Sequence, residues 1–106
     1  MSKTLFDLIK IIKKRKNKSS NNSYTYFLFK KGKTYCLKKF KEEALELIKA
    51  LESNKKKNII HESADVIYHF LILLEIKNIN IKSVFRELDR RKKISGIEEK
   101  KSRLKK

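Results

Sequence analysis

Apolar residues recur along the chain at intervals of three and four positions, which is the spacing of one face of an α-helix. This pattern predicts a first helix near the start of the chain and a second, longer helix over residues 35–53. The first stripe contains Leu5, Leu8, Ile9 and Ile12, and the second contains Leu37, Phe40, Ala44, Leu47, Ile48 and Leu51. The period is that of a helix and not the period of two expected of a strand.

A polar loop and a short helix are predicted between these two helices. Residues 17–23 are polar throughout and read as a loop. Ser23 is placed to cap a short helix over 24–31, because a serine hydroxyl can accept a hydrogen bond from the first free backbone amides. Gly32 is then the expected end of that helix.

A third long helix is predicted over 59–77, after a polar connector at 54–58 with Asn58 as the N-cap. Residues 66–76 are apolar on almost every side of this helix. A chain of 106 residues is too small to cover such a helix on all sides by itself. A second copy, most simply in a two-fold homodimer, is therefore the expected partner.

The last apolar stripe predicts a fourth main helix, which begins near residue 81 and ends in a basic cluster at 90–93. Its apolar residues are Ile81, Val84, Phe85 and Leu88. The tail, 95–106, has no such stripe. We therefore expect an all-α fold with one domain over 1–94, four main helices and a basic tail. The second and third long helices, joined by a short connector, should form a central antiparallel hairpin.

The composition supports helices and excludes several kinds of protein. Proline is absent and glycine occurs twice, so a sandwich or barrel with many tight turns is excluded. Cys36 is the single cysteine, which excludes an internal disulfide and makes a reducing cytoplasm the expected location. The longest uncharged apolar run is much shorter than the ~20 residues that cross a bilayer, and the first sixteen residues lack the features of a signal peptide. No membrane association is expected.

The net charge of +17 is unevenly distributed. Residues 1–34 carry +9 and residues 76–106 carry +8, whereas residues 35–75 are neutral, with seven lysines and seven acids. A basic surface can attract nucleic acid or a small phosphorylated ligand. Many of these lysines can equally be ordinary solvated surface, so the charge alone does not identify a partner.

The acids of the neutral middle fall into two groups. Glu42, Glu43 and Glu46 lie on the second long helix, and Glu62 and Asp65 on the third. Residues three apart project from one helix face, so each helix presents a carboxylate pair. Both pairs border an apolar stripe, and in a hairpin they can face each other. Ordinary solvated faces of charged helices remain the alternative explanation.

Converging carboxylates repel one another, by roughly 3 kcal/mol for two charges about 5 Å apart at an effective dielectric near 20. Protonation, lysines or a divalent cation would relieve this repulsion. Oxygen ligands favour Mg²⁺ or Mn²⁺ over zinc. His69, one turn after Asp65, is expected to orient a carboxylate. With neither an activated nucleophile nor a glycine-rich phosphate loop, metal-assisted attack by water is the chemistry that fits.

These acid motifs resemble the signature of the MazG-type all-α nucleoside triphosphate pyrophosphohydrolases. Further elements are similar to the phosphoribosyl-ATP pyrophosphohydrolase family. They are Ser23-Tyr24-Thr25, the break at Gly32, Lys38-Lys39-Phe40-Lys41-Glu42-Glu43-Ala44-x-Glu46, Glu62-Ser63-Ala64-Asp65-x-x-Tyr68-His69, Leu88-x-x-Arg91 and Ser95-Gly96-Ile97-Glu98-Glu99-Lys100-Lys101-Ser102-Arg103. Lys41 departs from the small residue, often glycine, that is usual in the family.

The resemblance implies hydrolysis of phosphoribosyl-ATP to phosphoribosyl-AMP and pyrophosphate, the second step of histidine biosynthesis, by an all-α homodimer with Mg²⁺. It implies metal binding and catalysis by Glu43, Glu46, Glu62 and Asp65, with Glu42 and His69 in support. The anionic substrate needs cations, for which the candidates are Lys38, Lys39 and Arg91. For Lys39 an ion pair within its own helix is the alternative.

Three other functions fit part of the sequence. A house-cleaning enzyme that hydrolyses dNTPs would share the acid motif, although the Ser-Tyr-Thr and tail elements argue against it. A small basic nucleic-acid-binding protein would explain the charge but not the acids, and no recognition helix stands out. A helical interaction module without catalysis would not need the acid set.

Overall fold

Five helices make up the parts of the chain that the computed structural model describes, which are residues 3–17, 23–93 and 100–101. They are α1 (Lys3–Lys16), α2 (Tyr24–Lys31), α3 (Lys33–Ser53), α4 (Lys56–Ile76) and α5 (Ile81–Lys92). No strand occurs in these ranges, which confirms the all-α prediction. Most of the predicted loop at 17–23 and most of the tail lie outside the described residues.

The two ends of α2 are formed as the sequence predicts. The Ser23 hydroxyl accepts a hydrogen bond from the Tyr26 amide at 3.0 Å, which satisfies one of the free amides of the first turn. Gly32 ends the helix with φ of 94° and ψ of 178°, a backbone conformation that side chains with a Cβ rarely adopt. The same residue starts α3, so one glycine sets the angle between α2 and α3.

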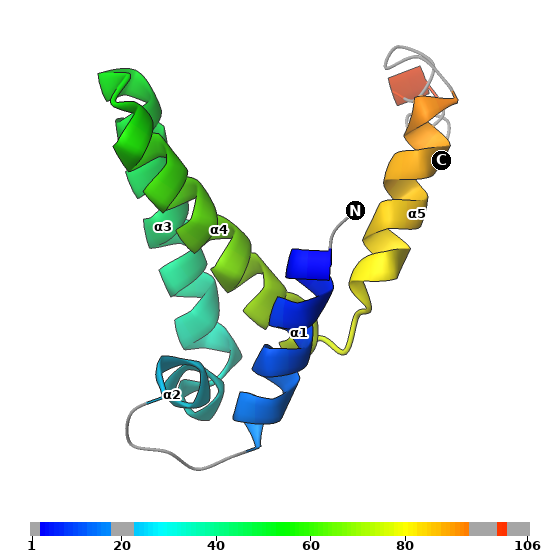
Figure 1. The fold of residues 1–106 in the computed structure, drawn as a ribbon. Coiled ribbons are helices and arrows are strands. Elements are labelled where there is room, and N and C mark those ends of the chain that lie inside the picture. Colours follow the sequence, from blue (N-terminus) through cyan, green and yellow to red (C-terminus); the bar gives the residue numbers. More distant parts are fainter. Residues whose placement is uncertain (1–2, 18–22, 94–99, 102–106) are drawn as a thin grey trace.

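Helices α3 and α4 run in opposite directions along each other (Figure 1) and form the most extensive helix–helix contact. The prediction of Asn58 as the N-cap of α4 is wrong, because α4 already begins at Lys56. Asn54 turns the chain in the left-handed conformation, with φ of 60°. Since asparagine tolerates this conformation, the connector needs only two residues and leaves Asn58 inside the helix.

The core lies where all five helices meet, at the end of the hairpin next to α2 (Figure 1). Its buried side chains are Ile12, Leu28, Cys36, Leu71, Ile72 and Ile81, one or two from each helix. Phe85 of α5 packs edge-on against Phe6 of α1, with ring centroids 6.1 Å apart. The far half of the hairpin and the far half of α5 extend beyond this core.

An apolar face of the hairpin stays open in the single chain. Ile48 and Leu51 of α3, and Ile60 and Ile67 of α4, are each half exposed or more, at 50–59%. Leu71 and Ile72, further along α4, are buried by the other helices. The nearly all-apolar segment of α4 is thus covered at one end and open at the other. No helix in the described ranges has both the length and the hydropathy to cross a membrane.

Candidate active site

The predicted carboxylates of α4 lie together. Glu62 and Asp65 each offer an oxygen, and His61 a nitrogen, with these ligand atoms all within 4.8 Å of one another. The His61 Nε2 atom is 3.4 Å from the Asp65 carboxylate. Three neighbouring positions on one helix, spaced i, i+1 and i+4, therefore form a small polar cluster that could hold a cation.

The charge of Glu43, on α3, also acts on this cluster. Burial, followed by a hydrogen bond to Asp65 and the Asp65 charge, raises the pKa of Glu62, and the Glu43 charge adds to the rise. His61 opposes it. A like-charge effect of this kind falls off with distance, so Glu43, Glu62 and Asp65 share one electrostatic environment. The structure thus brings three of the four predicted ligands into one region.

The other two candidate site acids of α3, Glu42 and Glu46, form ion pairs within their own helix. Glu46 forms an ion pair with Lys49 at 3.5 Å, and its side chain is half exposed. Glu42 forms an ion pair with Lys39 at 3.1 Å, and this contact raises the pKa of Lys39. The alternative considered for Lys39, an ion pair inside α3, is therefore what the structure shows.

Two further candidate phosphate contacts lie at the surface. Lys38 is exposed on α3, one residue before Lys39. Arg91 is near the end of α5, which points away from the hairpin (Figure 1), and its guanidinium is 3.0 Å from Glu87. Within one chain, Arg91 is therefore not brought to the carboxylates.

His69 links the acidic cluster to α2. Its Nδ1 atom is 2.8 Å from the backbone carbonyl oxygen of Asp65, and its Nε2 atom is 3.1 Å from the Tyr24 hydroxyl. The ring is buried, with 5% of the residue exposed. His69 was expected to orient a carboxylate, and the structure shows that it contacts the Asp65 backbone and holds Tyr24.

The Ser-Tyr-Thr stretch fixes α2 at three points. Ser23 caps the helix, Tyr24 contacts His69, and the Thr25 hydroxyl contacts the Tyr68 hydroxyl. Because Tyr68 and His69 are adjacent on α4, the two contacts form a pair that fastens the start of α2 to the middle of α4. Each residue of the Ser-Tyr-Thr motif, which is one of the elements similar to the family, therefore has a structural role.

Two residues of this region were not selected from the sequence as site residues. His61 contacts Asp65 at the i, i+4 spacing, and its position directly before Glu62 was the available signal. Tyr24 is 45 residues away along the chain from His69, the partner of its hydroxyl. No local spacing could reveal that contact.

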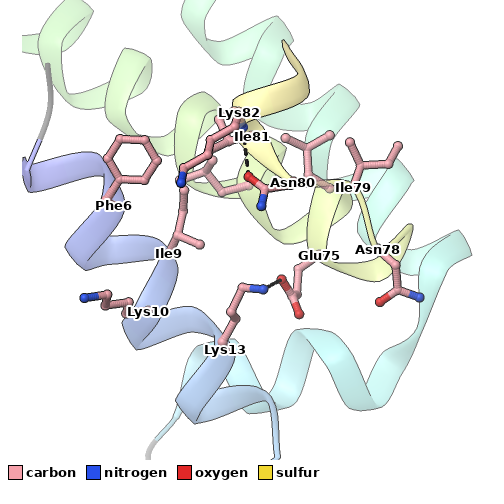
Figure 2. A pocket seen from close by; sticks show the side chains of 12 residues that line it. Phe6, Ile9, Lys10, Lys13, Glu75, Asn78, Ile79, Asn80, Ile81 and Lys82 are labelled. Carbon is pink, nitrogen blue, oxygen red and sulfur yellow. Dashed lines mark hydrogen bonds and ion pairs between the residues drawn. The ribbon is translucent and has the colours of Figure 1, made fainter. Parts of the chain in front are cut away.

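A pocket of about 360 Å³ lies elsewhere, between α1 and the turn from α4 to α5. Figure 2 shows apolar side chains such as Phe6 and Ile9 together with Lys10 and Lys13 around it. Its carboxylate, Glu75, is already bound by Lys13 at 3.5 Å and Lys16 at 3.3 Å. Since that charge is neutralised, the pocket lacks the ligand set of a metal site, and the α3–α4 region is the better candidate.

The chain is similar to known proteins over most of its length. The model of the family described as phosphoribosyl-ATP pyrophosphohydrolase matches residues 5–92. The chain is 42% identical over 100 residues to phosphoribosyl-ATP pyrophosphatase 1 of Bradyrhizobium diazoefficiens, covering 94% of each chain. It is 44% identical over 99 residues to phosphoribosyl-ATP pyrophosphatase of Dechloromonas aromatica, covering 93% of this chain and 92% of the relative.

A longer relative shares the same similarity over part of its length. The histidine biosynthesis bifunctional protein HisIE of Thermotoga maritima is 39% identical over 87 residues, which is 82% of this chain and 44% of that protein. The similar region thus occurs both alone and within a bifunctional chain.

Proposed function

The chain belongs to the phosphoribosyl-ATP pyrophosphohydrolase family, and from that premise we propose how it releases pyrophosphate from phosphoribosyl-ATP in histidine biosynthesis. The reaction takes place at the acidic face of the α3–α4 hairpin. The observation that supports this location is the cluster of His61, Glu62 and Asp65, whose ligand atoms lie within 4.8 Å of one another. The Glu43 charge also acts on Glu62.

A divalent cation fits this donor set. The clustered ligand atoms are mainly carboxylate oxygens, which Mg²⁺ prefers and Mn²⁺ also accepts. Glu62 and Asp65 would hold the ion from α4, with Glu43 and Glu46 from α3. A bound Mg²⁺ supplies charge neutralisation at phosphate oxygens and a more acidic bound water. It would also relieve the repulsion that acts on Glu62.

The residues around the carboxylates would orient the substrate. Glu46 and Glu42 exchange their lysine partners readily, because exposed ion pairs contribute about 0–1 kcal/mol. Release of Lys39 from Glu42 would free an ammonium one turn from Glu43, on the same helix, for a phosphate oxygen. Lys38 is exposed beside it and can serve the same purpose.

The open apolar face of the hairpin supports a homodimer. Ile48, Leu51, Ile60 and Ile67 would stay half exposed in a monomer, and burying apolar area contributes roughly 25 cal/mol per Å². A second copy that covers this face with its own is the simplest closed arrangement. A second copy is also the way in which an Arg91 could reach a set of carboxylates.

The test is pyrophosphate release from phosphoribosyl-ATP with Mg²⁺, with EDTA, and beside ATP and a dNTP panel. We expect Mg²⁺-dependent release from phosphoribosyl-ATP. Glu62→Gln or Asp65→Asn should reduce turnover by 100-fold or more, about 2.7 kcal/mol, with helicity retained. Glu52→Gln is the control, since Glu52 is an exposed acid of α3.

Each outcome has a distinct meaning. Full activity in both the Glu62 and Asp65 variants would contradict the metal-ligand assignment. Release from dNTPs but not from phosphoribosyl-ATP would keep the metal site and contradict the substrate. Equal loss in the Glu52 control would show that charge removal in general, and not the hairpin site, is responsible.

A further inference from the structure

Tyr24 is a polar residue next to the proposed site that neither the metal nor the phosphate assignments use. Its ring is held between Phe27, with centroids 6.2 Å apart, and His69, with centroids 5.9 Å apart. The residue is still 47% exposed, so solvent reaches it. A side chain that is fixed on two sides and open on a third is suited to position a small molecule.

The hydrogen bonds of His69 determine what the Tyr24 hydroxyl can do. The Asp65 carbonyl oxygen can only accept, so the His69 Nδ1 atom carries a proton and donates to it at 2.8 Å. In a neutral imidazole the Nε2 atom is then an acceptor. Against a neutral His69, the Tyr24 hydroxyl, 3.1 Å away, donates its only proton to the Nε2 atom.

A phenol oxygen whose proton is committed in this way can only accept on its open side. It repels a phosphate oxygen, which is also an acceptor, and this excludes Tyr24 as a phosphate contact. It attracts a donor, for which a water molecule or the Lys39 ammonium is available. Burial raises the pKa of Tyr24, the Lys39 charge lowers it and the Glu43 charge raises it further, so both charges act on the hydroxyl.

We propose that the Tyr24 hydroxyl, held by His69, positions the water that attacks the phosphoanhydride. This role rests on the proposed function and deepens it. The water oxygen forms a bond to phosphorus, the bridging P–O bond breaks with its electron pair on the leaving oxygen, and the water's proton passes to the solvent. Tyr24 accepts a hydrogen bond and takes no proton, since its own O–H stays with His69.

The chain contains a matched control for this role. Tyr24 and Tyr68 each place one hydroxyl between α2 and α4, the first on His69 and the second on Thr25. Tyr24→Phe and Tyr68→Phe therefore delete the same atom from the same helix pair. A merely structural role predicts the same kinds of change in both variants, namely a lower melting temperature and unaltered turnover per folded molecule.

A positioning role predicts a difference between the variants. The assay is steady-state kinetics of the full chain with phosphoribosyl-ATP and Mg²⁺. We expect Tyr24→Phe to lower kcat about tenfold, because one hydrogen bond is lost in the transition state. The KM should stay within about twofold of the wild-type value. Tyr68→Phe should keep the wild-type kcat. Circular dichroism melts of both variants establish that the comparison is made between folded proteins.

Two results would overturn the proposal. The first is an equal kcat in the two variants. The second is a raised KM with unchanged kcat in Tyr24→Phe, because that result would make Tyr24 a substrate contact. In either case the wild type remains active, so the proposed function stands. No pyrophosphate release from the wild type would overturn the proposed function and this role together. A further variant, Tyr24→Leu, removes both ring and hydroxyl and should show a kcat no higher than that of Tyr24→Phe.

Discussion

Gly32 joins α2 to α3 with φ of 94° and ψ of 178°, a conformation that essentially only glycine occupies. A Cβ built there would meet no atom within 4 Å, so crowding cannot contribute to the cost of a side chain. We predict that Gly32→Ala destabilises the fold through backbone strain alone. The strain is about 1–3 kcal/mol, offset by about 0.4–1 kcal/mol because alanine restricts the unfolded chain.

The net cost, about 1.3 kcal/mol from the middle of each range, corresponds to a fall of roughly 5–10 °C in melting temperature for a domain of this size. Thermal unfolding followed by circular dichroism measures it. Activity should also fall, since Gly32 sets the angle at which α2 presents Tyr24 to His69. Asn54→Ala is the comparison, because Asn54 has φ of 60° and ψ of 20°, the milder left-handed conformation.

The value of ψ allows a sharper test. Asparagine tolerates the left-handed region but not ψ near 180°, so Gly32→Asn should be as destabilising as Gly32→Ala. D-Alanine at position 32, introduced by chemical synthesis of the chain, has the mirror-image preferences and should restore the wild-type melting temperature. If Gly32→Ala melts with the wild type, or D-alanine is no better than L-alanine, then strain at this residue is not what requires glycine.

Two further predictions concern the hairpin face and α5. Ile67→Lys places a charge on the half-exposed apolar face and should shift the proposed dimer to monomer in sedimentation. Lys57→Glu, an exposed change on the same helix, should not. Glu87 should titrate at about pH 2, because hydrogen bonds from Arg90 and Arg91 lower its pKa, and NMR of its side chain measures this. Since that pKa is lowered, any stability from these contacts is present at pH values above the ordinary glutamate pKa and is lost as the pH falls toward 2. A titration midpoint of Glu87 near its ordinary value of 4.5 would contradict the contacts.

Four of the five helices could be read from the sequence because each has an apolar stripe of the right period, and α2 could be read from the residues at its two ends. Helix α2 matches its predicted bounds, and its Ser23 cap and Gly32 end are where side-chain chemistry puts them. The start of α4 was missed by three residues, since the left-handed turn at Asn54 shortens the connector. Side-chain capping at Asn58 was a reasonable signal, but a turn of two residues made it unnecessary.

The site was only partly accessible to sequence reasoning. Helical spacing placed Glu62 and Asp65 together and put Glu43 at the edge of the apolar stripe, and the structure has them in one electrostatic environment. The local partners of Glu46 could not be predicted with the same certainty, because a lysine three residues away competes with any distant contact. The contact between Tyr24 and His69 depends on how α2 packs against α4, which no spacing encodes.

The distribution of charge gives a physical reason for a site completed by two chains. The substrate carries a triphosphate and a further phosphate, whereas the middle of the chain is neutral overall. Two lysines of α3, Lys39 and Lys49, are paired with Glu42 and Glu46. The excess of positive charge lies in residues 1–34 and 76–106, and α5 carries part of it away from its own hairpin. A second copy packed on the open apolar face can supply cations that lie far from the carboxylates within one chain. We therefore expect the proposed homodimer and the binding of an anionic substrate to depend on each other.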